Sequence, residues 1–207
     1  MKVERLRRAL RSGQPVRDED FDALLPLEYQ RASTRFWTPM HAARCAAQWF
    51  EEQGVGRVLD VGAGVGKFCT IGALATRDVS FIGVEYRASL VRVASDVIDV
   101  LGADRAMVVH GSVQDIHAND YDAFYFFNPF VENVITSSSR LDSSVELSET
   151  RQRQDILAAE RLLAGARGGT TVVTYFGYGG PMPDGYHLID EEHAGGPLRL
   201  WRKDMAS

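Results

Sequence analysis

An apolar segment runs into three alternate glycines in the stretch Val58-Leu59-Asp60-Val61-Gly62-Ala63-Gly64-Val65-Gly66-Lys67-Phe68. Apolar residues followed by glycines and then by a helix-forming run predict a strand, a tight loop and a helix. Glycine lets the backbone adopt conformations closed to other residues and lets a ligand approach the chain closely. The stretch therefore predicts a ligand-binding loop, with a simple tight turn between strand and helix as the alternative.

Two nucleotide-binding loops do not fit this stretch. A phosphate-binding loop needs a glycine where Val61 stands and a serine or threonine where Phe68 stands. A dinucleotide-binding fingerprint needs its third glycine at the position of Lys67. The observed G-x-G-x-G spacing therefore favours a different ligand.

Predicted strands and helices alternate on both sides of this loop. Apolar runs predict strands over residues 57–61, 79–84, 106–110, 121–127 and 170–176. Helical patterns occupy residues 40–50, 67–75, 89–101 and 149–163. Strands that alternate with helices, several of them apolar throughout, predict a parallel sheet that is covered on both faces. The predicted fold class is therefore α/β, with a doubly wound, mostly parallel sheet.

The alternation changes towards the end of the chain. Two short segments, residues 186–190 and 197–201, leave no room for a helix between them. We therefore expect them to pair as an antiparallel hairpin at the sheet edge. Residues 133–148 are rich in serine and show no apolar period, which predicts a loop inserted after the fourth strand.

Composition places the chain among ordinary globular domains. It has 207 residues, a hydrophobic content of 45% and a formal net charge of −5. No apolar run reaches the roughly 18 residues that a membrane span needs, and the first residues lack the apolar core of a signal peptide. We therefore expect a cytoplasmic protein without a membrane partner. The negative net charge also argues against non-specific binding of nucleic acid.

The beginning of the chain follows a different pattern. Its first eleven positions are rich in basic residues. This pattern is more typical of a solvated helix or a frayed terminus than of an arm that contacts phosphate. A short helical pattern from Asp18 to Tyr29 is interrupted by Pro26. We expect residues 1–36 to form a cap that is appended to a main domain over residues 37–207.

The motif Asp60-x-Gly62-x-Gly64-x-Gly66 resembles the first motif of the class I S-adenosylmethionine-dependent methyltransferases. The resemblance covers residues 55–203 and implies a Rossmann-like domain, whose seven-stranded sheet is completed by the terminal hairpin. It implies S-adenosylmethionine as the cofactor, with the three glycines under its methionine part and adenosine. Asp60, at the strand end, is then placed to meet the cofactor's amino group or a bridging water.

Further candidate cofactor residues follow the next two predicted strands. Glu85 comes at the carboxyl end of its strand, where an acid can accept both ribose hydroxyls. Tyr86 can flank the adenine, or serve only in packing. After the third strand, the family usually carries an acid that contacts the adenine amino group, and this chain has Ser112 there. Ser112 can still accept a hydrogen bond, and the backbone amide of Val113 can meet a ring nitrogen.

The fourth strand opens into Asn128-Pro129-Phe130-Val131-Glu132, at the edge where open α/β sheets bind ligands. Asn-Pro-Phe is similar to the Asn-Pro-Pro-aromatic motif of amide- and adenine-N-methylating relatives, and more distantly to a segment of the non-SET histone lysine methyltransferases. Both similarities imply a nitrogen acceptor. Asn128 would then contact the cofactor and aim the acceptor, while Glu132 takes its proton or attracts a cation. Alternatively, Asn128 holds the turn and Glu132 begins a helix.

The leading hypothesis is an S-adenosylmethionine-dependent methyltransferase that acts on a protein or small molecule rather than on nucleic acid. One alternative is a non-catalytic module that keeps only the cofactor pocket, favoured by Ser112 and by the incomplete Asn-Pro-Phe motif. The other is an NAD(P)-dependent oxidoreductase, disfavoured by Lys67. The five histidines and two cysteines show no metal-ligand spacing, so we expect no metal site.

Overall fold

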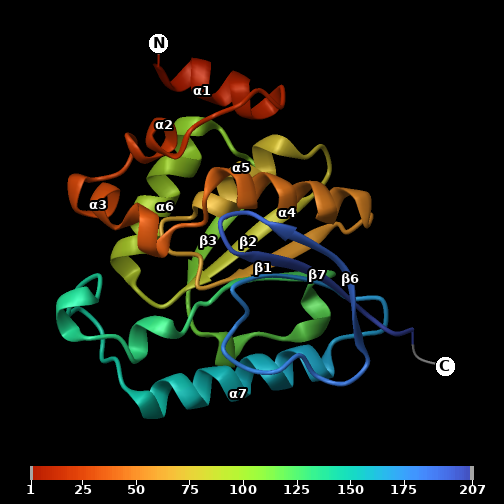
Figure 1. The fold of residues 1–207 in the computed structure, drawn as a ribbon. Coiled ribbons are helices and arrows are strands. Elements are labelled where there is room, and N and C mark those ends of the chain that lie inside the picture. Colours follow the sequence, from red (N-terminus) through yellow and green to blue (C-terminus); the bar gives the residue numbers. More distant parts are fainter. Residues whose placement is uncertain (1, 206–207) are drawn as a thin grey trace.

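The computed structural model describes residues 2–205, which build a single seven-stranded sheet (Figure 1). The strands are β1 (Arg57–Val61), β2 (Ser80–Glu85), β3 (Ala106–His110), β4 (Ala123–Phe127), β5 (Thr171–Tyr175), β6 (Tyr186–His193) and β7 (Pro197–Lys203). Their order is β3-β2-β1-β4-β5-β7-β6. The first five pair in parallel, and β7 runs antiparallel to both β5 and β6. The predicted sheet and its terminal hairpin are confirmed.

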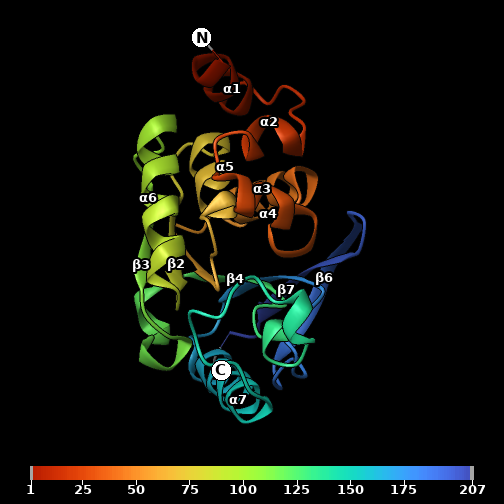
Figure 2. The same ribbon diagram turned by 90° about the vertical axis from the view of Figure 1, so that its left-hand side faces the viewer.

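Helices cover both faces of the sheet. They are α1 (Lys2–Arg11), α2 (Asp18–Asp22), α3 (Leu27–Phe36), α4 (Met40–Glu52), α5 (Lys67–Ala75), α6 (Ala88–Leu101) and α7 (Glu149–Gly165). In Figure 2, α4, α5 and α6 lie on one face with α1 to α3 outside them, and α7 lies on the other. The doubly wound arrangement follows from strands that are apolar on both sides, as in β1, where Val58 and Leu59 are both fully buried in opposite apolar clusters.

The strand order reverses direction at β1. The chain builds β1, β2 and β3 towards one edge and then places β4 on the other side of β1. The carboxyl ends of β1 and β4 therefore diverge into different connections, which leaves a crevice at this end of the sheet. The glycine loop after β1 and the Asn128 segment after β4 both lie at this point.

The N-terminal helices pack more firmly than the sequence suggests. Leu6 and Leu10 of α1 are buried in the same apolar cluster as Phe68 of α5, so α1 is neither frayed nor fully solvated. Pro26 does not simply end a helix, because it stands at the N-cap of α3, a helix absent from our prediction. The ammonium group of Lys67, itself buried, pairs with Asp18 at 2.6 Å and with Asp22 at 2.9 Å, which ties α2 to α5.

The connections beyond β4 follow the predicted pattern. Between Val131 and the start of α7 the chain forms only two short 3-10 turns, η3 (Val131–Asn133) and η4 (Ser137–Ser139). The serine-rich segment is thus an irregular insertion, as predicted. The turn between β6 and β7 is made by residues 194–196. No helix in the described part of the chain is long and apolar enough to cross a membrane.

Candidate active site

A cavity of about 510 Å³ lies at the carboxyl ends of the central strands. It is lined by the glycine loop, by the residues that follow β2, β3 and β4, and by the entry to α4 and the serine-rich insertion. Its size falls in the range of about 300–1,000 Å³ that is typical of small-molecule sites. The location is the one at which open α/β sheets bind ligands.

Gly62 and Gly64 form one wall of the cavity, and both require glycine. Their φ angles are +77° and +56°, a region that other residues rarely adopt. A Cβ at Gly62 would lie 2.7 Å from the Cβ of Pro129, and one at Gly64 would lie 2.6 Å from the ring of Trp37. The loop is thus held between Pro129 and Trp37, with its backbone facing the cavity.

Gly66 has a different role from the one expected, because it does not line the cavity. A Cβ at this position would lie 2.9 Å from the Cβ of Ala94 on α6. Gly66 therefore allows close packing between the loop and α6, instead of contact with a ligand.

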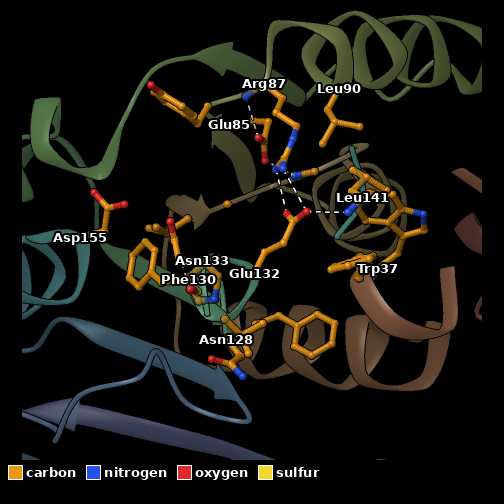
Figure 3. A pocket seen from close by; sticks show the side chains of 18 of the residues that line it. Trp37, Glu85, Arg87, Leu90, Asn128, Phe130, Glu132, Asn133, Leu141 and Asp155 are labelled. Carbon is orange, nitrogen blue, oxygen red and sulfur yellow. Dashed lines mark hydrogen bonds and ion pairs between the residues drawn. The ribbon is translucent and has the colours of Figure 1, made fainter. Parts of the chain in front are cut away.

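Glu85 ends β2 and faces the cavity (Figure 3). Its carboxyl oxygens accept hydrogen bonds from the backbone amides of Gly64, at 2.9 Å, and Arg87, at 2.8 Å. Burial raises the pKa of Glu85, and these two amides oppose the rise. A carboxylate has about four acceptor sites, so two remain for the hydroxyls of a ribose.

Asp60 does not line the cavity, and its expected contact with the cofactor's amino group or with a bridging water stays a prediction. Its side chain is buried against α5, where the thiol of Cys69 donates a hydrogen bond to it at 3.5 Å. Burial raises the pKa of Asp60 to about 7, and the charge of Glu85 adds to the rise while the thiol opposes it. Asp60 therefore lies beneath the loop, in contact with α5.

Tyr86, Ser112 and Val113 line one end of the cavity, and their expected contacts with the adenine stay predictions. The Ser112 hydroxyl accepts a hydrogen bond from the amide of Gln114 at 3.3 Å and so caps the turn η1 (Val113–Asp115). The guanidinium carbon of Arg151, from α7, lies 3.8 Å from the centre of the Tyr86 ring. This end thus combines a flat aromatic surface with hydrogen-bonding groups.

Asn128 lies on the cavity wall beside a group of aromatic rings. Within residues 2–205, Asn128 and Phe176 are the two non-glycine residues with positive φ, at +38° and +57°. The backbone N–H of Asn128 donates to the carbonyl oxygen of Gly177 at 2.9 Å, which joins the ends of β4 and β5. The rings of Phe127 and Tyr175 lie 4.8 Å apart, and Phe176 is 4.8 Å from Tyr175.

Glu132 is occupied by an ion pair, and this geometry does not support the predicted role as proton acceptor. Arg87 reaches it with both terminal nitrogens, at 2.9 and 3.0 Å, and the amide of Leu141 donates to it at 2.6 Å (Figure 3). Arg87 also pairs with Asp142 at 3.2 Å. These contacts fasten the serine-rich insertion to the end of β2, so Glu132 positions that segment.

Several residues of the cavity wall were missed by sequence reasoning, among them the charged residues Arg35, Arg87, Arg151 and Asp155. Asp155 carries the one usable signal, because it is an acid on the stripe of α7 that otherwise buries Ala159, Leu162 and Leu163. Arg87 and Arg151 follow no pattern of their own. Within residues 2–205, no three His, Cys, Asp or Glu side chains gather as metal ligands.

The sheet order, the glycine loop and the acid at the end of β2 together define a class I S-adenosylmethionine-dependent methyltransferase. The sequence model of protein-L-isoaspartate(D-aspartate) O-methyltransferase matches residues 17–129, and the chain belongs to this family. The protein is therefore an S-adenosylmethionine-dependent methyltransferase. This membership decides against the oxidoreductase alternative and against a non-catalytic module.

Solved structures agree with this fold. A methyltransferase from Geobacter sulfurreducens superposes with a TM-score of 0.62 and 15% identity, over 97% of each chain. An RNA methyltransferase from Salinibacter ruber in complex with S-adenosyl-L-homocysteine superposes with a TM-score of 0.52 and 18% identity, over 82% of this chain and 95% of the other. No curated protein matches the sequence.

The cavity fits the cofactor of this class. Gly62 and Gly64 leave backbone, not side chains, on its wall, and Glu85 has acceptor sites for a diol. Tyr86 presents a ring to the same cavity, and its side chain is partly exposed. The cavity thus offers backbone, a carboxylate and an aromatic ring, which are group types that suit the methionine part, the ribose and the adenine of S-adenosylmethionine.

Proposed function

We propose that this methyltransferase acts on a nitrogen atom of a protein or small molecule, at the part of the cavity that Asn128 faces. The proposal depends on one observation, the positive φ angles of Asn128 and Phe176 at the ends of the neighbouring strands β4 and β5. Such conformations cost about 1–3 kcal/mol each and persist where a site requires them. An amide and an aromatic ring at these two strand ends support an acceptor site on this side of the cavity.

The cofactor supplies an activated methyl group, which is transferred by in-line displacement. The protein then has to orient the acceptor and exclude water. The side-chain oxygen of Asn128 can accept a hydrogen bond from an N–H of the substrate nitrogen. This bond orients the nitrogen so that its lone pair points towards the methyl group. Phe127, Tyr175 and Phe176 provide an apolar wall beside it. An apolar wall disfavours the charged form of an amine, so the reactive neutral form is favoured.

The charges of the cavity also favour a neutral nitrogen over a carboxylate acceptor. Among the described residues of the cavity wall, Arg87 is paired with Glu132 and Asp142, and Arg151 is paired with Asp155. The side chain of Arg35 donates to the carbonyl oxygen of Ser139 at 2.8 Å. Arg87 and Arg151 are thus already neutralised by carboxylates, which disfavours an anionic acceptor beside them. The net charge of −5 likewise supports a protein or small molecule over nucleic acid.

We further propose that Gly62, Gly64, Glu85, Tyr86, Ser112 and Val113 hold the cofactor along the cavity wall. The first pair lies under the methionine part, Glu85 takes the ribose, and the remaining three surround the adenine. Asn128 lies next to the sulfonium in this arrangement, between cofactor and acceptor.

The stability of the methylated product tests the choice of acceptor atom. The protein is incubated with methyl-labelled S-adenosylmethionine and fractionated cell extract, and the labelled products are treated with mild base. N-methyl groups survive this treatment, whereas methyl esters release volatile methanol. We expect the label to remain with a protein or small-molecule fraction, and label that is lost as methanol would show a carboxylate acceptor.

Substitutions at Asn128 test its part in the reaction. Asn128→Gly accepts the φ of +38° but lacks the amide, so we expect kcat to fall about tenfold to a hundredfold with a smaller change in cofactor affinity. Asn128→Asp keeps a side-chain oxygen and should retain more activity. An unchanged kcat in Asn128→Gly would leave Asn128 with a role only in the turn.

A further inference from the structure

Asp155 is an acidic residue in a place where an apolar one is expected. It lies on the buried stripe of α7, and its exposed fraction is 6%. Acids are seldom buried without a partner or a use, because the desolvation of a charged group is costly. Its side chain reaches the wall of the cavity at the end formed by Ser112 and Val113.

The contacts of Asp155 fix its side chain but leave some of its hydrogen-bond acceptor sites free. The side-chain amide of Gln114 donates to one carboxyl oxygen at 2.9 Å, and Nε of Arg151 lies 3.3 Å from the other. A carboxylate offers about four acceptor sites, so Asp155 can accept further hydrogen bonds from the cavity. Arg151 is fixed in turn against the ring of Tyr86.

The position of Asp155 relative to Glu85 identifies the part of the cofactor that it meets. In Figure 3, Trp37 and Asp155 lie on opposite sides of Glu85. Trp37 packs on Gly64 of the glycine loop, next to the methionine part. With the ribose at Glu85, the base extends away from the loop, towards Asp155. The exocyclic amine of adenine carries two N–H donors and needs an acceptor at this end.

We propose that Asp155 accepts a hydrogen bond from the exocyclic amine of adenine and makes the enzyme select adenosyl over 6-keto nucleosides. Ser112 is a weaker candidate, because its hydroxyl already accepts from the amide of Gln114. The selection thus comes from α7, far along the chain from the glycine loop. This proposal rests on the cofactor placement given under Proposed function.

Calorimetric titration with two ligands tests the proposal. S-adenosylhomocysteine carries the amine, and S-inosylhomocysteine carries a keto oxygen in its place. We expect the wild type to bind the first about tenfold to a hundredfold more tightly, because the second sets an oxygen against Asp155. Asp155→Asn can donate to the keto oxygen, so it should narrow this preference by about tenfold. Glu149→Gln, on the exposed side of the same helix, should keep both affinities.

The outcomes separate recognition from a structural role. If Asp155 only braces Gln114 and Arg151, the Asn variant weakens both ligands equally, and the proposal is wrong. A wild type that binds both ligands equally also overturns it, whether or not the variant folds. Failure of the folded wild type to bind S-adenosylhomocysteine would overturn the cofactor placement as well.

Discussion

Glu85 combines two tasks in one carboxyl group, because it fixes the glycine loop through Gly64 and faces the cavity with its remaining acceptor sites. Replacing it with alanine removes the proposed ribose contacts and loosens the loop. We expect Glu85→Ala to weaken the binding of S-adenosylhomocysteine by about 2 kcal/mol, measured by isothermal titration. A variant that binds as well as the wild type would show that the ribose lies elsewhere.

Asp60 makes the stability of the protein depend on pH. Its pKa is about 7 in the folded state and 3.8 ordinarily, with burial as the main cause. Between these values the folded state keeps a proton that the unfolded state has lost. Stability is therefore highest below this window, falls as pH rises through it, and stays level above it. The loss from this group amounts to about 4 kcal/mol.

Asp60→Asn isolates this contribution, because an amide mimics the protonated acid and can still accept the hydrogen bond from Cys69. Urea unfolding at about pH 5 and about pH 8 gives the free energy of unfolding of both proteins. We expect the wild type to lose stability across this range relative to the variant. Glu85 and other groups titrate in both proteins, so only the difference reports Asp60. Parallel pH profiles would contradict a raised pKa.

The buried pair of Arg87 and Glu132 connects β2 to the insertion after β4. Arg87→Ala leaves the buried Glu132 without its counter-ion and should cost roughly 3–5 kcal/mol. Glu132→Ala should cost less, because Arg87 keeps its ion pair with Asp142. The double variant leaves no such charge at this pair and should cost clearly less than the sum. Urea unfolding of the four proteins in the cycle measures the coupling. Additive losses would show that Glu132 acts independently of Arg87.

The same pair predicts the behaviour of the serine-rich insertion. Residues 134–148 have little regular structure, and Arg87 reaches them through Glu132 and Asp142. Arg87→Ala should therefore raise hydrogen exchange in residues 134–148 while α7 stays protected. Equal exchange in variant and wild type would mean that other contacts hold the insertion.

Across the whole molecule, the sheet and most helices were predictable because their signals are local. Alternating apolar runs and the glycine loop lie within short stretches of sequence. The start of α3 was missed because Pro26 can end one helix or precede the next. The roles of Arg87 and Asp155 were missed for another reason, since their partners Glu132 and Gln114 are distant in sequence. Such pairs form only when the chain folds, so no local sequence pattern predicts which residues pair.

The junction between residues 1–36 and the rest of the chain yields a prediction for the whole molecule. Leu10 of α1 is 1% exposed and belongs to the apolar cluster that continues to α5, whereas Leu27 of α3 is 69% exposed. Leu10→Ala should therefore lower the free energy of unfolding by roughly 2–4 kcal/mol, and Leu27→Ala by less than about 0.5 kcal/mol. Because one cluster joins both parts, fluorescence and circular dichroism should report a single transition. An early separate transition in Leu10→Ala would show a cap that unfolds on its own.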